Sequence, residues 1–213
     1  VKFAVVGVIS ANLIAFALAL VLSKNRRGTN TYRTIIFMPN LIGGIILGYI
    51  WQLLLNGILI RLTGNDITFD ATYGYWGLII LYNWQKIGYL MIIYIAGIQA
   101  IPGDLIEAAR IDGANAKQIL KRIIVPLVSG SVTICMFLSL TDCFKMYDQN
   151  LALTGGAPAN QTTMLALNIF NTYYNRKGFA GIGQAEAVIF TIIVFAISII
   201  QLRVSRSREV KEA

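Results

Sequence analysis

Long runs of apolar side chains alternate along the chain with short connections that carry most of the charged residues. A helix needs about 20 mostly apolar residues to cross the hydrocarbon core of a membrane. Five segments meet this requirement, and together they predict an all-α, polytopic membrane protein. The predicted spans are residues 1–22, 34–55, 76–100, 126–147 and 185–202.

The composition supports this interpretation. Of the 213 residues, 56% are hydrophobic and only 13% are charged, whereas about 25% are charged in a typical soluble protein. The mean hydropathy is +0.66. The first apolar run lacks a basic leader and a small-residue cleavage site, so it predicts a span and not a signal peptide.

Basic residues indicate how the spans are oriented. Twelve of the 18 Lys and Arg residues lie in three segments, 23–33, 101–125 and the tail after residue 202. These residues are Lys24, Arg26, Arg27, Arg33, Arg110, Lys117, Lys121, Arg122, Arg203, Arg206, Arg208 and Lys211. Because Lys and Arg are retained on the cytoplasmic side, we expect the three segments to be cytoplasmic. Residue 1 then falls outside, and we expect an upstream helix that brings the count to six.

Several functional classes are excluded by what the sequence lacks. It contains no His, and its two cysteines, Cys135 and Cys143, lie within or near a span. We therefore expect no disulfide framework, no metal site and no intramembrane catalytic centre. The net charge of +8 follows from topology and favours contact with anionic lipid. It does not predict nucleic-acid binding, because the basic residues are divided among separate segments.

One charged segment is unexpected between two apolar runs. Residues 101–125 contain a helix-like stretch at 105–111, a break at Gly113 and a second helix-like stretch at 114–125, and Pro126 then begins the next span. This pattern predicts a compact helical elbow. A solvated loop whose charges merely hold the topology is the alternative.

The elbow resembles a known motif. Glu107-Ala108-Ala109, Gly113 and the run Ile123-Ile124-Val125-Pro126 resemble the EAA signature of permeases from binding-protein-dependent ABC importers, with only Val125 departing from it. Three further stretches, YRTIIFMP, AIPGDLIEAARIDGA and LALTGGAPANQTTMLALNIFN, resemble the first permease subunit of maltose/maltodextrin importers. The resemblance covers essentially the whole chain.

The resemblance implies a single transmembrane domain over residues 1–213 in a bacterial or archaeal cell membrane. Segment 101–125 would couple it to two ATPase subunits, and segment 148–184 would form an outer loop that faces an extracellular or periplasmic substrate-binding protein. A second related permease subunit and a sugar complete the implied set of partners. The implied coupling interface comprises Glu107, Ala108, Ala109, Asp112 and Gly113. ATP and magnesium would be bound by the ATPase subunits, because this sequence contains no G-x-x-x-x-G-K-[ST] motif.

Charged residues within the spans are candidates for the transport path. Lys86 lies in the first half of the third span, and Asp142 and Lys145 lie near the outer end of the fourth. A charge at mid-bilayer costs at least about 2.5–3.5 kcal/mol, so we expect Lys86 to line a path or to pair with Asp142. Snorkelling to the membrane surface remains the alternative for Asp142 and Lys145.

The resemblance places sugar-contacting positions on the same two spans. They are Tyr82, Gln85, Lys86, Tyr89, Ser139, Asp142, Cys143 and Met146. The first four are spaced as one face of a helix, and aromatic rings and polar groups suit the faces and hydroxyls of sugars. An ion-coupled secondary carrier that uses Lys86 and Asp142 is the alternative function.

Overall fold

The computed structural model describes residues 1–24 and 27–212, without the side chains of residues 202 and 204–213. The described residues form helices joined by short connections and contain no strand, which confirms the all-α prediction. The helices are α1 (Lys2–Leu22), α2 (Thr29–Phe37), η1 (Met38–Leu41), α3 (Gly44–Thr63), α4 (Ala71–Gln99), α5 (Gly103–Ile111), α6 (Ala116–Ile119), η2 (Leu120–Ile124), α7 (Val125–Leu127), α8 (Ser129–Lys145), α9 (Asp148–Leu153), α10 (Leu165–Phe170), η3 (Asn171–Asn175) and α11 (Ala180–Glu212).

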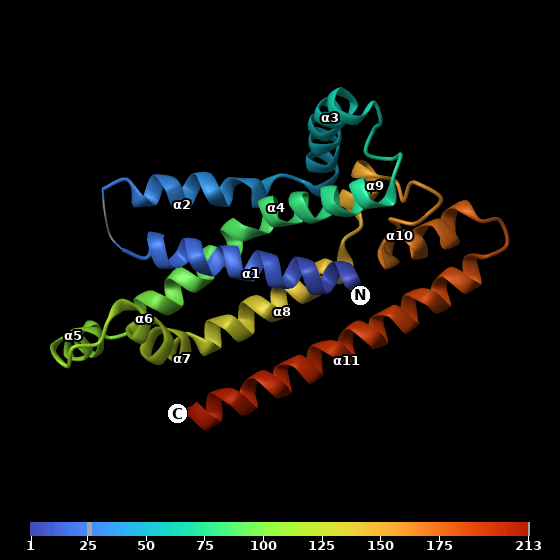
Figure 1. The fold of residues 1–213 in the computed structure, drawn as a ribbon. Helices are drawn as coiled ribbons and strands as arrows, with labels where there is room; N and C mark the ends of the chain where they lie inside the picture. Colours follow the sequence, from blue (N-terminus) through green and yellow to red (C-terminus); the bar gives the residue numbers. More distant parts are fainter. Residues whose placement is uncertain (25–26, 213) are drawn as a thin grey trace.

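Within the described residues, four helices are long and apolar enough to cross a membrane: α1, α3, α4 and α11 up to residue 201. A fifth candidate is the pair Ala116–Leu127 and Ser129–Lys145, which bends by 67° at Val128. Helix α1 packs against α4 and α8, α2 packs against α4, and α11 packs against α8 (Figure 1).

The centre of the bundle is a seam of small residues on α1. Gly7, Ala11, Ala15 and Ala19 recur every fourth position and are all buried. A Cβ added at Gly7 would lie 3.2 Å from the Sγ atom of Cys143 on α8 and 3.4 Å from the ring of Tyr82 on α4. Small side chains allow helix backbones to approach closely, and this seam therefore brings α4 and α8 together around α1.

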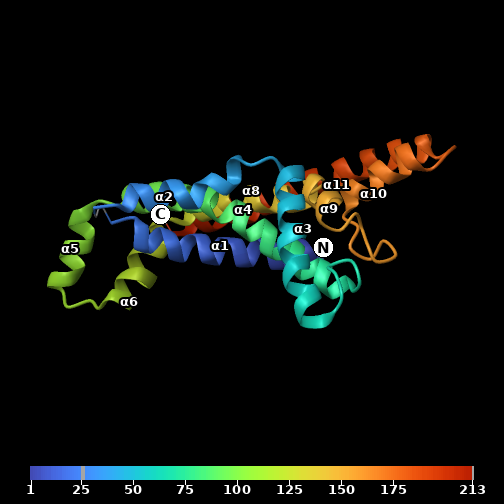
Figure 2. The same ribbon diagram turned by 90° about the horizontal axis from the view of Figure 1, so that it is seen from above.

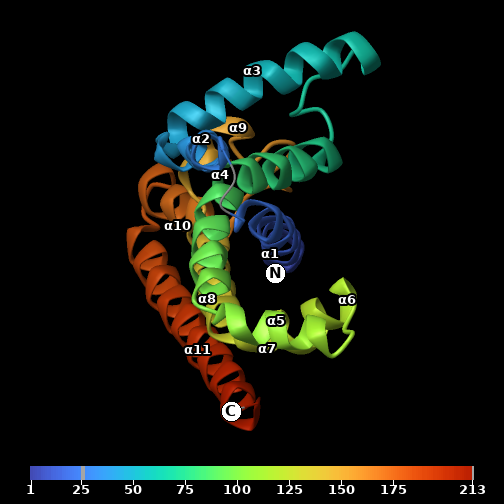
Figure 3. The ribbon, with the colours of Figure 1, turned by 90° about the vertical axis from the view of Figure 1, so that its left-hand side faces the viewer.

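The prediction of one continuous span over 34–55 is wrong. Helix α2 ends at Phe37, η1 contains Pro39, and Ile42 is extended before α3 begins at Gly44. Proline lacks an N–H group and disrupts a continuing helix. After the break, α3 runs across the direction of α1 and α2, as two views at right angles show (Figures 1 and 3).

Two glycines explain how α3 is held in this transverse position. A Cβ at Gly44 would lie 2.7 Å from the Cβ of Asp148, and one at Gly48 would lie 2.6 Å from the Cβ of Ala152. Both contacts are with α9, which packs closely along α3. The segment predicted as an outer loop over 148–184 is therefore largely folded, since it contains α9, α10, η3 and the start of α11.

A buried asparagine organises the irregular part of this outer segment. The amide of Asn150 donates to the carbonyl of Thr162 at 2.9 Å and to the Thr154 hydroxyl at 3.0 Å. Its Oδ1 accepts from the backbone N–H of Met164 at 2.8 Å. These bonds satisfy a connection that would otherwise leave buried backbone groups unpaired.

The two ends of the bundle differ. The elbow formed by α5 and α6, the end of α1, the start of α2 and the end of α11 lie at one end, whereas α9, α10 and residue 1 lie at the other (Figures 1 and 2). The described parts of the three basic segments thus share one end, as the sequence predicts. Arg26 lies outside the described residues, as do the side chains of Arg206, Arg208 and Lys211.

Substitution of Gly88 tests the contact between α2 and α4. A Cβ at Gly88 would lie 2.8 Å from the Cα of Phe37 and closer still to the Ile36 carbonyl. Because backbone meets backbone there, Gly88→Ala should lower stability by about 1–3 kcal/mol, measured by thermal unfolding of the detergent-solubilised protein.

Gly57→Ala is the matched control, because a Cβ at Gly57 in α3 meets nothing within 4 Å. It should leave stability unchanged or raise it by up to about 1 kcal/mol, the helix preference of Ala over Gly. Equal melting temperatures for the two variants would contradict the close approach of α2 and α4.

Candidate functional site: a polar pocket between α4 and α8

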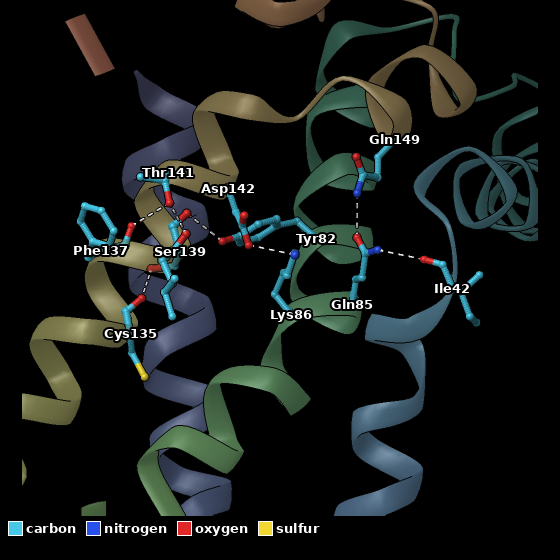
Figure 4. A network of polar contacts seen from close by, with 11 residues as sticks. Ile42, Tyr82, Gln85, Lys86, Cys135, Phe137, Ser139, Thr141, Asp142 and Gln149 are labelled. Atoms are coloured by element: carbon cyan, nitrogen blue, oxygen red, sulfur yellow. Dashed lines mark hydrogen bonds and ion pairs between the residues drawn. The ribbon is translucent and has the colours of Figure 1, made fainter. Parts of the chain in front are cut away.

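An ion pair joins the two helices that flank the elbow. The Nζ atom of Lys86 on α4 lies 2.8 Å from the Oδ2 atom of Asp142 on α8 (Figure 4). The two side chains are 21% and 36% exposed, so neither is fully enclosed. The pair predicted from the sequence is therefore confirmed, and it gives Lys86 and Asp142 each a partner of opposite charge.

The ion pair borders a polar pocket at the end of the bundle opposite the elbow. The pocket has a volume of about 240 Å³. Its lining consists of Tyr82, Lys86, Asp142, Lys145, Met146, Tyr147, Asp148 and Gln149. Two cationic and two anionic side chains face this space, so its formal charge is balanced. Lys145 lies one turn after Asp142 at the end of α8, and Asp148 reaches the pocket because α9 follows α8 after a short connection.

Gln85 lies beside this pocket without lining it. It is buried, its amide donates to the Ile42 carbonyl at 3.3 Å, and its Oε1 accepts from the Gln149 amide at 2.8 Å (Figure 4). Gln149 does line the pocket. Gln85 therefore connects the break before α3, the α4 helix and the pocket wall on α9.

Tyr82 and Ser139 contribute to helix packing. The Tyr82 hydroxyl donates to the Ser139 carbonyl at 3.0 Å, and the Ser139 hydroxyl donates to the Cys135 carbonyl at 2.7 Å (Figure 4). Cys143 is buried against Gly7. Tyr82 also borders the polar pocket, whereas Ser139 and Cys143 do not.

Of the eight predicted sugar-contacting residues, the structure brings four to this pocket: Tyr82, Lys86, Asp142 and Met146. Tyr89 is partly buried and packs against the apolar core. Both predicted spans thus border the pocket, but only part of the predicted face of each reaches it. That these residues contact a sugar stays a prediction.

Sequence reasoning missed Asn12, which links three helices. Its amide donates to the Ser139 hydroxyl at 2.8 Å, and its Oδ1 accepts from the Tyr94 hydroxyl at 2.8 Å. The signal was present, because an amide in the middle of an apolar run needs a partner within the protein just as a charge does. Asp148 and Gln149 were missed because they fall in the segment predicted as a loop.

The elbow has the predicted helix–turn–helix form. Helix α5 ends at Ile111, Gly113 has a φ of +83°, and the Asn115 and Gln118 side chains form a reciprocal cap at the start of α6. A left-handed φ favours glycine. Glu107, Ala108, Asp112 and Gly113 are exposed, and Ala109 is half-buried.

A hollow of about 360 Å³ lies on the inner side of this elbow. It is lined by Ala109, Asp112, Gly113, Ala114, Gln118, Ile119, Arg122 and Ile123. Ile111 at the tip is 87% exposed. Charged and apolar side chains thus share an exposed surface that is not covered by the described residues.

In the described part of the chain, no group of three or more His, Cys, Asp or Glu side chains could hold a metal ion. Both cysteines, Cys135 and Cys143, are free and buried.

A double-mutant cycle tests whether Lys86 and Asp142 stabilise each other. Lys86→Ala leaves an unpaired carboxylate and Asp142→Ala leaves an unpaired ammonium group, whereas the double variant leaves neither. We expect each single variant to be less stable than the double variant, with a coupling energy of about 1 kcal/mol, measured by thermal unfolding in detergent. Lys145→Ala is the control, because Lys145 lines the same pocket without an ion pair among the described residues. Strictly additive losses would contradict the coupling.

The sequence was compared with protein families and with known proteins. Residues 7–210 match the family described as "Binding-protein-dependent transport system inner membrane component". The chain is 41% identical to the "Probable starch degradation products transport system permease protein AmyD" of Thermoanaerobacterium thermosulfurigenes, with 99% of this chain and 74% of that protein covered. It is 32% identical to the "Trehalose/maltose transport system permease protein MalF" of Thermococcus litoralis, with 98% and 73% covered.

Solved structures agree in fold. The chain is similar to one in the crystal structure of a bacterial alginate ABC transporter in complex with an alginate pentasaccharide-bound periplasmic protein, with a TM-score of 0.81, 18% identity and coverage of 98% of this chain and 76% of that chain. A second crystal structure of a bacterial ABC transporter involved in alginate import gives a TM-score of 0.79 at 19% identity, with 97% and 78% covered. The chain therefore belongs to the family of inner membrane components of binding-protein-dependent transport systems, and it is a multi-pass membrane protein with the fold of an ABC transporter permease.

Proposed function

We propose that this chain is the permease subunit of an ATP-driven importer of uncharged sugars or oligosaccharides, and that it forms half of the translocation path. The observation that carries the proposal is the 41% identity over nearly the whole chain to a permease named for starch degradation products. The charge balance of the polar pocket supports it, since Lys86, Lys145, Asp142 and Asp148 together carry no net formal charge. Such a lining suits a solute rich in hydroxyl groups better than an acidic one.

The coupling surface is the elbow. We place it on the cytoplasmic side, because it shares one end of the bundle with the basic connections and Lys and Arg are retained on that side. Helix α5 follows α4 directly, and η2 and α7 lead into α8. A displacement of the elbow would therefore move both helices that hold the Lys86–Asp142 pair. This is rigid-body coupling between packed elements.

The remaining partners follow from this arrangement. Two ATPase subunits would bind ATP and magnesium and contact Glu107, Ala108, Ala109, Asp112 and Gly113. A second related permease subunit would supply the other half of the path. A substrate-binding protein would deliver the solute at the end formed by α9 and α10. Membership of the family supports this set and gives no support to an ion-coupled carrier.

Reconstitution tests the proposed function. The chain, purified with its co-expressed permease and ATPase partners, is placed in proteoliposomes together with the cognate binding protein. We expect uptake of radiolabelled maltose or maltopentaose that requires ATP and is insensitive to ionophores. Uptake driven by an ion gradient without ATP would instead show a secondary carrier.

Charge reversal at Glu107 tests the coupling surface. Glu107 is exposed on α5, so Glu107→Lys should leave folding and membrane insertion intact while abolishing ATP-driven uptake through loss of ATPase docking. Uptake and copurification of the ATPase subunits are both measured. Asp104→Lys, which makes the same charge change in the first turn of the same helix, should retain most of the uptake. Normal uptake by inserted Glu107→Lys protein would contradict the docking role.

A further inference from the structure

A second, widely open cavity adjoins the polar pocket at Tyr147, and four aromatic side chains contribute to its lining. Its volume is about 520 Å³. It is bounded by α10, η3, the first turns of α11 and the connection that follows α8. The side chains that matter for its chemistry are Tyr147, Phe170, Tyr173, Tyr174 and Gln184. Three phenol hydroxyls and one amide therefore accompany four aromatic rings in a single space.

The four rings form a connected series. The ring centres of Tyr147 and Phe170 are 5.1 Å apart, those of Phe170 and Tyr174 are 4.7 Å apart, and those of Tyr173 and Tyr174 are 4.6 Å apart. Contacts in this range hold rings in defined relative orientations. Tyr174 lies between Phe170 and Tyr173 in this series and is nevertheless 68% exposed. It is thus an exposed aromatic side chain that contacts a ring on each side.

The backbone beneath the rings is fixed by close packing. A Cβ at Gly183 on α11 would lie 2.8 Å from the Tyr173 Cβ and 2.9 Å from its Cα. Thr172, one residue earlier, is only 1% exposed. The segment that carries Tyr173 and Tyr174 is a π-helical turn, a conformation that is often found at functional sites.

Tyr147 connects this cavity with the polar pocket. It lies between α8 and α9, and its side chain lines both spaces. Burial is the main cause that raises the pKa of Tyr147, with further contributions from Asp148 and Tyr174. Tyr147 thus contributes a phenol group to the boundary between the two spaces.

We propose that this aromatic cavity is a second sugar subsite, in which the pyranose ring of an oligosaccharide stacks on Tyr174 while another ring of the same chain occupies the polar pocket. The proposal rests on the proposed function and specifies its substrate as an oligosaccharide that is long enough to reach both spaces. The apolar faces of a pyranose suit aromatic rings, and its hydroxyls suit the phenols and Gln184. A monosaccharide or short disaccharide fills only one of the two spaces.

An ordinary tyrosine belt accounts less well for these observations. Tyrosines are enriched where a helix bundle meets the membrane surface, but a belt requires neither a shared cavity nor continuity with a polar pocket. Here the rings converge from α10, η3 and the α8–α9 connection onto one space.

Direct binding without the substrate-binding protein tests the subsite. The assembled transporter in lipid nanodiscs is titrated with radiolabelled maltose and, separately, with maltopentaose. The wild-type protein should bind maltopentaose more tightly than maltose. Tyr174→Ala should raise the Kd for maltopentaose about two- to tenfold, the range expected for loss of one aromatic contact, and should leave the Kd for maltose unchanged. Tyr174→Phe keeps the ring and should bind maltopentaose nearly as tightly as the wild type.

Tyr32→Ala is the matched control, because Tyr32 is 62% exposed on α2, away from this cavity. It should change neither Kd. Equal weakening of both sugars by Tyr174→Ala, or no change in either, would overturn the subsite. An effect that appears only after the binding protein is added would also overturn it, since Tyr174 would then contact that protein.

The outcomes separate the two proposals. If the wild-type transporter shows no ATP-driven uptake of either sugar and binds neither, the proposed function is wrong. If uptake occurs but maltopentaose binds no more tightly than maltose, the transport function stands and the aromatic subsite fails.

Discussion

Polar groups inside an apolar bundle must find their partners within the protein, because hydrocarbon offers none. This constraint explains the polar contacts among α1, α4 and α8 at the centre of the bundle. Lys86 pairs with Asp142, Asn12 joins Ser139 to Tyr94, and Tyr82 donates to the carbonyl of Ser139. Each bond links two of the helices α1, α4 and α8. The same side chains that would be costly in lipid therefore define how the three helices are placed.

The small-residue seam on α1 makes this arrangement possible. Gly7, Ala11, Ala15 and Ala19 leave room for α4 and α8 to approach closely enough for short hydrogen bonds. Larger side chains would separate the helices and leave Asn12 without its partners. Apolar packing and polar pairing are thus two parts of one interface, since the first sets the distance over which the second acts.

The ion pair and the elbow are connected by the same two helices, α4 and α8. Helices α4 and α8 extend from the elbow at one end of the bundle to the polar pocket at the other (Figure 1). In the proposed coupling, a push on α5 would act on α4, and a push on α6 would reach α8 through the bend at Val128. At the far end, Tyr147 stands between the polar pocket and the aromatic cavity.

The sequence by itself determined the membrane class, the elbow with its break at Gly113 and the two intramembrane charges that pair. These features depend on local composition and on residue types whose placement in lipid is costly, so they can be identified without knowledge of contacts. Only the tertiary structure decided that residues 34–55 break and that α3 turns across the bundle, because the direction after a break depends on packing against α9. It also decided that Asp148, Gln149 and the rings of η3 face the pockets. Those residues lie far from α4 in sequence, and only close packing of distant segments brings Asp148 and Gln149 beside Lys86 and the rings of η3 to the cavity that Tyr147 shares.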